Sequence, residues 1–132
     1  MKQNLSHPAR VIPLIMYCLL MLASFTKLNA QCTLVCANPN PAMAGNISPG
    51  ENCMATVVVD TVVTSAGMCT GTFTVVAKTL LGVVIATGTD SVTIPAFNYL
   101  NTIIEIEVIN DLEGNSCSSF YLVEDKQRPS IL

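Results

Sequence analysis

Cysteine is the residue type in this 132-residue chain whose number and spacing point most directly to chemistry. Five of the six cysteines follow residue 30, at Cys32, Cys36, Cys53, Cys69 and Cys117. A structural zinc site needs close pairs such as C-x2-C, but no such pair occurs, and the single histidine, His7, precedes all five. In an exported protein these cysteines are expected to form disulfides.

Enzymatic chemistry has few candidates in this sequence. Residues 31–132 contain no histidine, which removes the base that most serine and cysteine nucleophiles require. A pair of carboxylates could serve glycoside hydrolysis, and Glu105 and Glu107 are the nearest pair. Because they lie two residues apart on an alternating segment, the solvent face of a strand explains them better. We therefore expect no catalytic residue, no cofactor and no enzymatic activity.

The segment NDLEGNS and the acidic residues near the C-terminus contain oxygen atoms of the kind that calcium prefers. The possible oxygen ligands are Asp111, Glu113, Asn115, Glu124 and Asp125. An EF-hand loop needs glycine at its sixth position and a bidentate glutamate at its twelfth, whereas Gly114 is fourth from Asp111. The segment is better explained as a hairpin turn in which Gly114 and Asn115 adopt positive φ, so no metal ligand is assigned.

Residues 1–30 have the layout of a secretory signal peptide. A basic start is followed by an apolar segment of 15 residues, Val11 to Phe25, and Ala30 precedes Gln31 as a small residue at a cleavage position. The alternative is a membrane anchor, but a span needs about 20 apolar residues, and this segment is shorter and contains Pro13. We predict export and cleavage between Ala30 and Gln31, so that no membrane span remains.

The charge of the remaining chain excludes one class of partner. Residues 31–132 carry three basic and nine acidic side chains, which gives a net charge of −6. Binding to phosphate backbones needs clustered lysine and arginine, so nucleic acid is not an expected partner. Anionic membrane surfaces are disfavoured for the same reason.

The elements that must position these residues are short strands. Turn residues separate segments rich in β-branched residues, and TIIEIEVIN places Ile104, Ile106 and Val108 on one face. The expected strands lie at 42–47, 53–64, 72–79, 83–88, 91–96, 102–110 and 118–125. About seven strands at a spacing near ten residues predict an all-β, antiparallel, immunoglobulin-like sandwich over residues 42–125, after a Pro/Asn-rich segment at 31–41. A small jelly roll or open barrel is the alternative.

This strand order also predicts a disulfide pattern. In an up-and-down arrangement, Cys69 follows the second strand and Cys117 follows the last hairpin turn, so both lie at the same end of the sandwich. We therefore expect a Cys69–Cys117 bridge, with Cys36–Cys53 by elimination. Cys32 is then left as a free or intermolecular thiol.

Three segments in combination resemble a known family. They are CTLVCANPNPAMAGNISPGENCMATV, MCTGTFTVV and GNSCSSFYLVEDKQRPSI. The cysteine after EN (Cys53), the GNSC turn (114–117) and VEDK (123–126) are the most specific pieces. They resemble a module of large secreted surface proteins of gliding-type Gram-negative bacteria, which lies beside HYR (hyalin repeat) domains and upstream of a type IX secretion sorting domain. This chain has Ser118 where the family usually has tryptophan. The resemblance implies an immunoglobulin-like fold, an adhesive or structural role, and no catalytic residues.

The C-terminal segment 126–132 reads as a linker toward a following module. Pro129 fixes φ and removes a donor, which suits a stiff connection, and Ile131 and Leu132 have no strand of this domain to complete. Members of the family continue here into an HYR domain. The expected partners are therefore neighbouring β-rich modules of the same polypeptide, and other cell-surface proteins or glycans.

Two classes of function follow from these expectations. The first is a secreted or cell-surface structural or adhesion module, a fragment or truncated relative of a long adhesin. The second is a ligand-binding module for glycan or calcium that uses loops at one end of the sandwich. The absence of tryptophan argues against a platform for stacking sugar rings.

Overall fold

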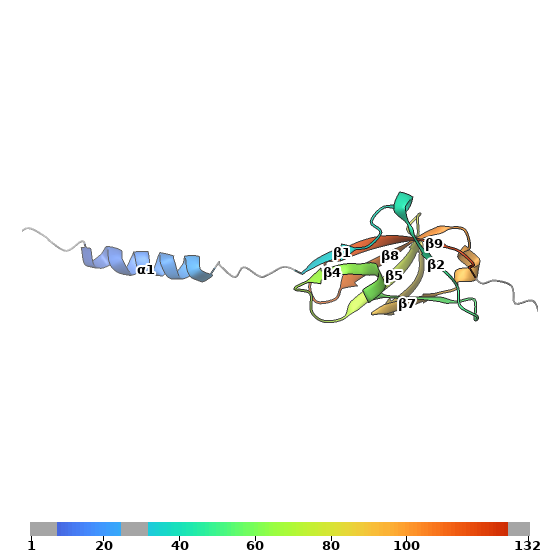
Figure 1. The fold of residues 1–132 in the computed structure, drawn as a ribbon. Helices are drawn as coiled ribbons and strands as arrows, with labels where there is room; N and C mark the ends of the chain where they lie inside the picture. The colour runs from blue at the N-terminus through green and yellow to red at the C-terminus, as the bar shows by residue number, and fades with distance from the viewer. Residues whose placement is uncertain (1–7, 25–31, 127–132) are drawn as a thin grey trace, which may run out of the picture. The chain divides into compact units, whose positions relative to one another are not determined.

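The computed structural model describes residues 8–24 and 32–126, and the chain divides into two units, residues 1–30 and 31–132. In the first unit, α1 (Pro8–Ser24) is a helix of 17 residues with Pro13 inside it (Figure 1). Within the described ranges, no helix is both long and apolar enough to cross a membrane. The predicted cleavage site, Ala30–Gln31, and all but the first residue of the predicted linker 126–132 lie outside the described residues.

The second unit is built mostly from strands (Figure 1). Those described are β1 (Thr33–Cys36), β2 (Gly45–Ile47), β3 (Ala55–Val58), β4 (Val63–Gly67), β5 (Phe73–Thr79), β6 (Val84–Thr89), β7 (Ser91–Ile94), β8 (Ile103–Asn110) and β9 (Ser116–Val123). Three short helical segments lie between them, namely η1 (Pro41–Met43), α2 (Val59–Val62) and η2 (Ala96–Tyr99). The expectation of a β-rich domain is confirmed, although the described chain has nine strands and not seven.

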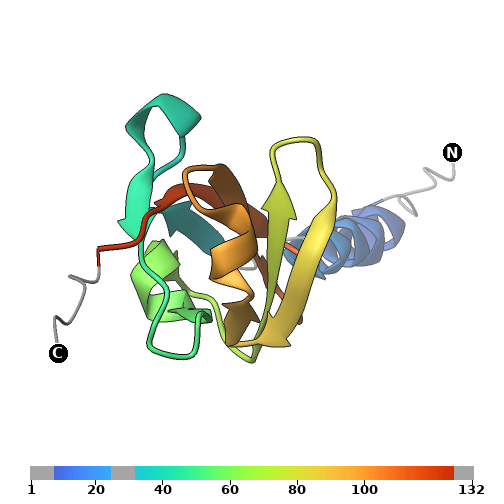
Figure 2. The ribbon, with the colours of Figure 1, turned by 90° about the vertical axis from the view of Figure 1, so that its right-hand side faces the viewer.

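The strands form one large sheet and two pairs. The large sheet has the order β2-β9-β8-β5-β6 and is antiparallel except for the parallel contact between β2 and β9. The pairs β1-β4 and β3-β7 are both antiparallel. Figure 2 turns the domain by 90° and shows the β5-β6 hairpin (yellow) beside η2 (orange). The chain leaves the large sheet between β6 and β7, so this corner joins the sheet to the β3-β7 pair.

Alternation along the strands builds the core as the sequence predicted. Ile104, Ile106 and Val108 are at most 1% exposed, while Glu105 and Glu107 lie on the other face of β8. Inward residues of β3, β5 and β7 belong to the same apolar cluster, which joins the large sheet to the β3-β7 pair. Each fully buried aliphatic side chain of this kind stabilises the fold by about 1.5–3 kcal/mol.

The predicted strand 53–64 is interrupted by the one-turn helix α2. Val59 and Val62 are both buried, at 8% and 0% exposure, and residues three apart share a face in a helix but not in a strand. The amide of Val59 donates to the carbonyl of Asp90 (3.0 Å), which ends the pairing of β3 at this point. Burial of two valines therefore outweighs the strand preference of this β-branched segment.

The segment 31–41, expected to precede the sandwich, contributes strand β1 to the domain. Thr33 lies opposite Gly67 and Cys36 opposite Val63 in the β1-β4 pair. After β1, Asn38 binds the segment to β9 as well. Its amide donates to the hydroxyl of Ser119 (3.2 Å), and its carbonyl accepts from the amide of Phe120 (2.9 Å). The predicted boundary at residue 42 is therefore wrong, and the domain begins before β1.

Candidate functional site

The structure corrects the predicted disulfides. Cys32 pairs with Cys69, with their Cα atoms 4.4 Å apart, and Cys36 pairs with Cys117, with their Cα atoms 5.7 Å apart. Cys53, expected to pair with Cys36, is free and exposed. Both predicted bridges, Cys69–Cys117 and Cys36–Cys53, are thus wrong, as is the free Cys32.

The physical reason for this correction is the unexpected strand β1. Because β1 pairs antiparallel with β4, its first residues lie beside the end of β4, and Cys32 comes next to Cys69. The end of β1 lies against β9 and brings Cys36 to Cys117. Cys53 sits before β3 in a turn with φ of 61°, where its side chain faces solvent.

The two candidate carboxylates of β8 lie on one face, as predicted, and each has a partner. Glu105 accepts a hydrogen bond from the hydroxyl of Ser118 on β9 (2.5 Å). Glu107 forms an ion pair with Lys78 on β5, and the side chains of both residues are 23% exposed. The hydrogen bond from Lys78 to Glu107 raises the pKa of the lysine, against a smaller lowering by burial. This arrangement is a cross-strand network on the sheet face.

Oxygen atoms that were candidates for binding calcium form hydrogen bonds or ion pairs within the protein. Asp111 accepts from the hydroxyls of Thr72 (2.7 Å) and Thr74 (2.6 Å), and these bonds lower the pKa of its carboxyl group. Glu124 pairs with Lys126 at 3.4 Å, at the other end of β9 from the turn that contains Asp111. Among the residues of the described ranges, no group of three or more Asp, Glu, His or Cys side chains could hold a metal ion.

The turn 111–115 joins β8 to β9 as a hairpin, as predicted, and it also holds the start of the domain. Gly114 has a φ of 74°, whereas Asn115 is not in the positive-φ region that was expected for it. The amide of Cys32 donates to Glu113 (2.9 Å), and the side-chain amide of Asn115 donates to the carbonyl of Cys32. Asn110, which is fully buried, donates to the carbonyl of Thr70 (2.8 Å) and accepts from the amide of Glu113 (2.9 Å).

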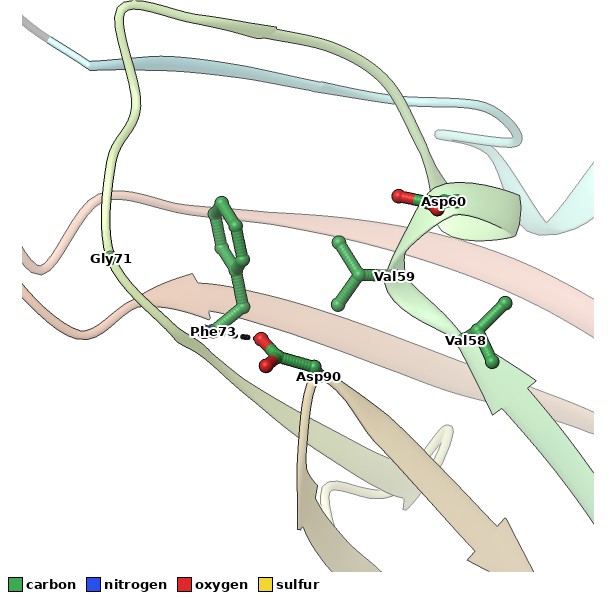
Figure 3. Close-up of a pocket in the computed structure, with 6 residues that line it drawn as sticks. All are labelled: Val58, Val59, Asp60, Gly71, Phe73 and Asp90. Atoms are coloured by element: carbon green, nitrogen blue, oxygen red, sulfur yellow. Dashed lines mark hydrogen bonds between the residues drawn. The ribbon is translucent and has the colours of Figure 1, made fainter.

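A cavity of about 210 Å³ opens at the corner between the large sheet and the β3-β7 pair. Its lining residues are Val58, Val59, Asp60, Gly71, Phe73 and Asp90. Figure 3 shows the ring of Phe73 on one side of this space, with Val59 and Asp60 opposite it and Asp90 below. The cavity therefore combines an apolar wall and an aromatic ring with two carboxylates.

Asp90 is fixed at this corner by three backbone contacts. Its amide donates to the carbonyl of Phe73 (2.8 Å), and its Oδ1 accepts from the amide of Phe73 (2.9 Å). Its carbonyl accepts from Val59, and its φ of 56° lies in the left-handed region, which aspartate tolerates better than most residues. One carboxylate oxygen of Asp90 thus has a structural role, while Oδ2 accepts no hydrogen bond from the residues that the structure describes.

Asp60 is exposed on α2, and its side chain makes no hydrogen bond or ion pair with any residue of the described part of the chain. The described domain, residues 32–126, contains two basic residues, Lys78 and Lys126, and each is paired elsewhere. Three of the four carboxylate oxygens at the cavity therefore have no bonded partner among residues 8–24 and 32–126. No basic side chain of the described domain compensates the negative charge at the cavity.

Sequence reasoning did not identify this cavity. Asp60 was part of an expected continuous strand, and Asp90 was part of an expected turn between two strands. The available signal was an aspartate in the middle of the β-branched run VVVDTVV, which interrupts a segment that otherwise suits a buried strand. The approach of Phe73 to both aspartates depends on the tertiary arrangement of the corner.

In comparisons with family models, curated proteins and solved structures, the chain has no match.

Proposed function

We propose that the chain is exported through a cleaved signal peptide at residues 1–30, and that the domain is a non-catalytic structural or adhesive module at the cell surface. We further propose that the domain belongs to the immunoglobulin-like sandwiches. The resemblance to HYR-associated modules supports both statements, as do the β-rich fold and the core between strand layers. Two disulfides support export, because such bonds persist mainly in oxidising compartments.

One observation carries the adhesive role, and it is the exposed apolar tip of the β5-β6 hairpin. Leu81 is 93% exposed, and Leu80, Val83 and Val84 are 53%, 61% and 58% exposed. Residues 80–84 carry no polar or charged side chain, so the exposed side chains of the tip are all apolar. Contiguous exposed apolar side chains of this kind mark contact surfaces in soluble proteins.

The export part of the proposal is tested by the mass and N-terminal sequence of protein recovered from the medium or the cell surface. The expected product begins at Gln31, and unreduced peptides join Cys32 to Cys69 and Cys36 to Cys117. Recovery of protein that retains residues 1–30 would contradict export by cleavage.

The adhesive part is tested by attachment of cells that produce the wild-type protein, or variants of it, to solid surfaces and to each other. Leu81→Ser is expected to reduce attachment at an unchanged surface amount, because it removes the most exposed side chain of the tip. Leu112→Ser is the matched control, since Leu112 is 70% exposed in the turn at the opposite end of β8. Equal attachment of both variants and wild type would refute a role of the tip.

A further inference from the structure

We propose that the corner cavity binds a basic side chain, lysine or arginine, of a protein partner. This inference specifies a partner chemistry for the proposed surface module, and therefore rests on that function. The cavity lies at the end of β5 that begins with Phe73, whereas the apolar hairpin tip lies beyond Thr79 at its other end. The two surfaces are separate, so they can be tested separately.

The size of the cavity fits one side chain. Pockets for drug-sized ligands enclose roughly 300–1,000 Å³, and the corner cavity of about 210 Å³ is smaller. The cavity is lined by residues of α2, β3 and β5 and of the β6-β7 corner. Gly71, which has no side chain, also lines it. A long, unbranched side chain can enter such an open recess, whereas a folded loop is too large.

The lining matches the two parts of a basic side chain. The methylene stem of lysine or arginine packs well on apolar surface, which Val58 and Val59 provide. The cationic group interacts favourably with an aromatic face, here that of Phe73, and with carboxylate oxygens. Figure 3 shows Asp60 directed across the space toward the side on which Phe73 lies.

Charge complementarity selects a cation over other polar groups. Among the described residues, neither the Asp60 side chain nor Oδ2 of Asp90 has a bonded partner. A ligand cation would therefore not have to displace a basic side chain of the described domain. The described domain has nine acidic residues and two basic ones, and both of the basic residues are already paired. The domain therefore attracts basic partners at long range as well as at the cavity.

The test is a titration of the exported, oxidised protein followed by the NMR signals of the backbone amides. The probes are the blocked tripeptides acetyl-Gly-Lys-Gly-amide and acetyl-Gly-Arg-Gly-amide, with acetyl-Gly-norleucine-Gly-amide as an uncharged probe of similar stem length. The basic peptides are expected to give saturable shifts at Gly71, Phe73 and Asp90. Added salt should weaken their binding, because the cavity is open to solvent.

Variants identify the groups responsible. Asp60→Asn is expected to weaken binding about fivefold, the upper range for one partly exposed ion pair. Asp90→Asn should act similarly while keeping the oxygen that accepts from the amide of Phe73. Glu51→Gln is the matched control, because it removes one exposed charge that does not line the cavity and should leave binding unchanged.

Three results would overturn the inference. The first is equal binding of the norleucine peptide, which would make the cavity a purely apolar site. The second is unchanged binding in Asp60→Asn, a substitution at an exposed residue that leaves the fold intact. The third is the absence of saturable shifts with both basic peptides, whether or not Ca²⁺ at equal ionic strength shifts the same amides. None of them affects the export or hairpin-tip tests, so failure here is distinguishable from failure of the proposed function.

Discussion

Removal of the Cys36–Cys117 disulfide should cost the domain a large part of its stability. The two cysteines are separated by 81 positions, and the chain-entropy model assigns a bridge over such a loop about 4.5 kcal/mol. A domain of this size has a free energy of unfolding of about 5–15 kcal/mol in total. The paired variant Cys36→Ala with Cys117→Ala is therefore expected to be folded only marginally.

The second bridge provides an internal comparison. Cys32–Cys69 closes a loop with a separation of 37, for which the same model gives about 3.8 kcal/mol. The paired variant Cys32→Ala with Cys69→Ala should therefore be destabilised by about 0.7 kcal/mol less than the Cys36–Cys117 variant. Cys53→Ala, which removes the exposed free thiol, should leave the free energy of unfolding within about 0.5 kcal/mol of wild type.

Urea unfolding of the oxidised proteins, followed by the fluorescence of tyrosine and by circular dichroism, gives each free energy of unfolding. The m-value must be compared too, because loss of a cross-link expands the unfolded chain and raises m. The reasoning is refuted if Cys53→Ala destabilises as much as either pair. It is also refuted if wild type loses no stability when its disulfides are reduced.

The remaining predictions concern a glycine and a carboxylate. In Gly88→Ala the new Cβ would lie 2.0 Å from the carbonyl oxygen of Ser91, and we expect a loss of about 3 kcal/mol in urea unfolding. In Gly82→Ala the new Cβ has free space and only the φ of 83° is strained, so the loss of stability should be about 1 kcal/mol. Equal losses in the two variants would contradict the close approach of Gly88 to Ser91. Because its hydroxyl partners lower the folded-state pKa of Asp111, its contribution to stability is present above the unfolded pKa and is lost as pH falls through the folded value. Asp111→Asn should therefore reduce the dependence of the unfolding midpoint on pH below about pH 4, and an unchanged acid profile would contradict this.

Local patterns predicted the strands of the large sheet because their burial follows the period of two. In β8 the alternation of isoleucine with glutamate determines which face is buried, and the structure confirms it. In β5, Val75 and Ala77 are likewise buried on one face of the strand. Such strands have one buried and one more exposed face, and the alternation of apolar and polar residues in the sequence shows which residues share a face.

The missed features depend on contacts between distant segments. Strand β1 is short, begins after Cys32 and ends at Cys36, and the prolines that follow it suggested a loop. Its place beside β4 and β9 is determined by pairing and by two disulfides, none of which leaves a local signal. The corner cavity was missed for the same reason, since Asp60 and Asp90 are 30 positions apart in the sequence.

The position of the Cys36–Cys117 bond determines how the domain responds to pulling. Tension applied at Cys32 runs along β1 to Cys36, crosses the disulfide to Cys117, and follows β9 to Val123. The chain between the two cysteines is bypassed, so it carries no tension while the bond is intact. When this bond and the Cys32–Cys69 bond are both reduced, the same 81 positions can extend by roughly 280 Å at full stretch. The oxidised domain therefore acts as a short, nearly inextensible element, and its reduction converts it into a long tether.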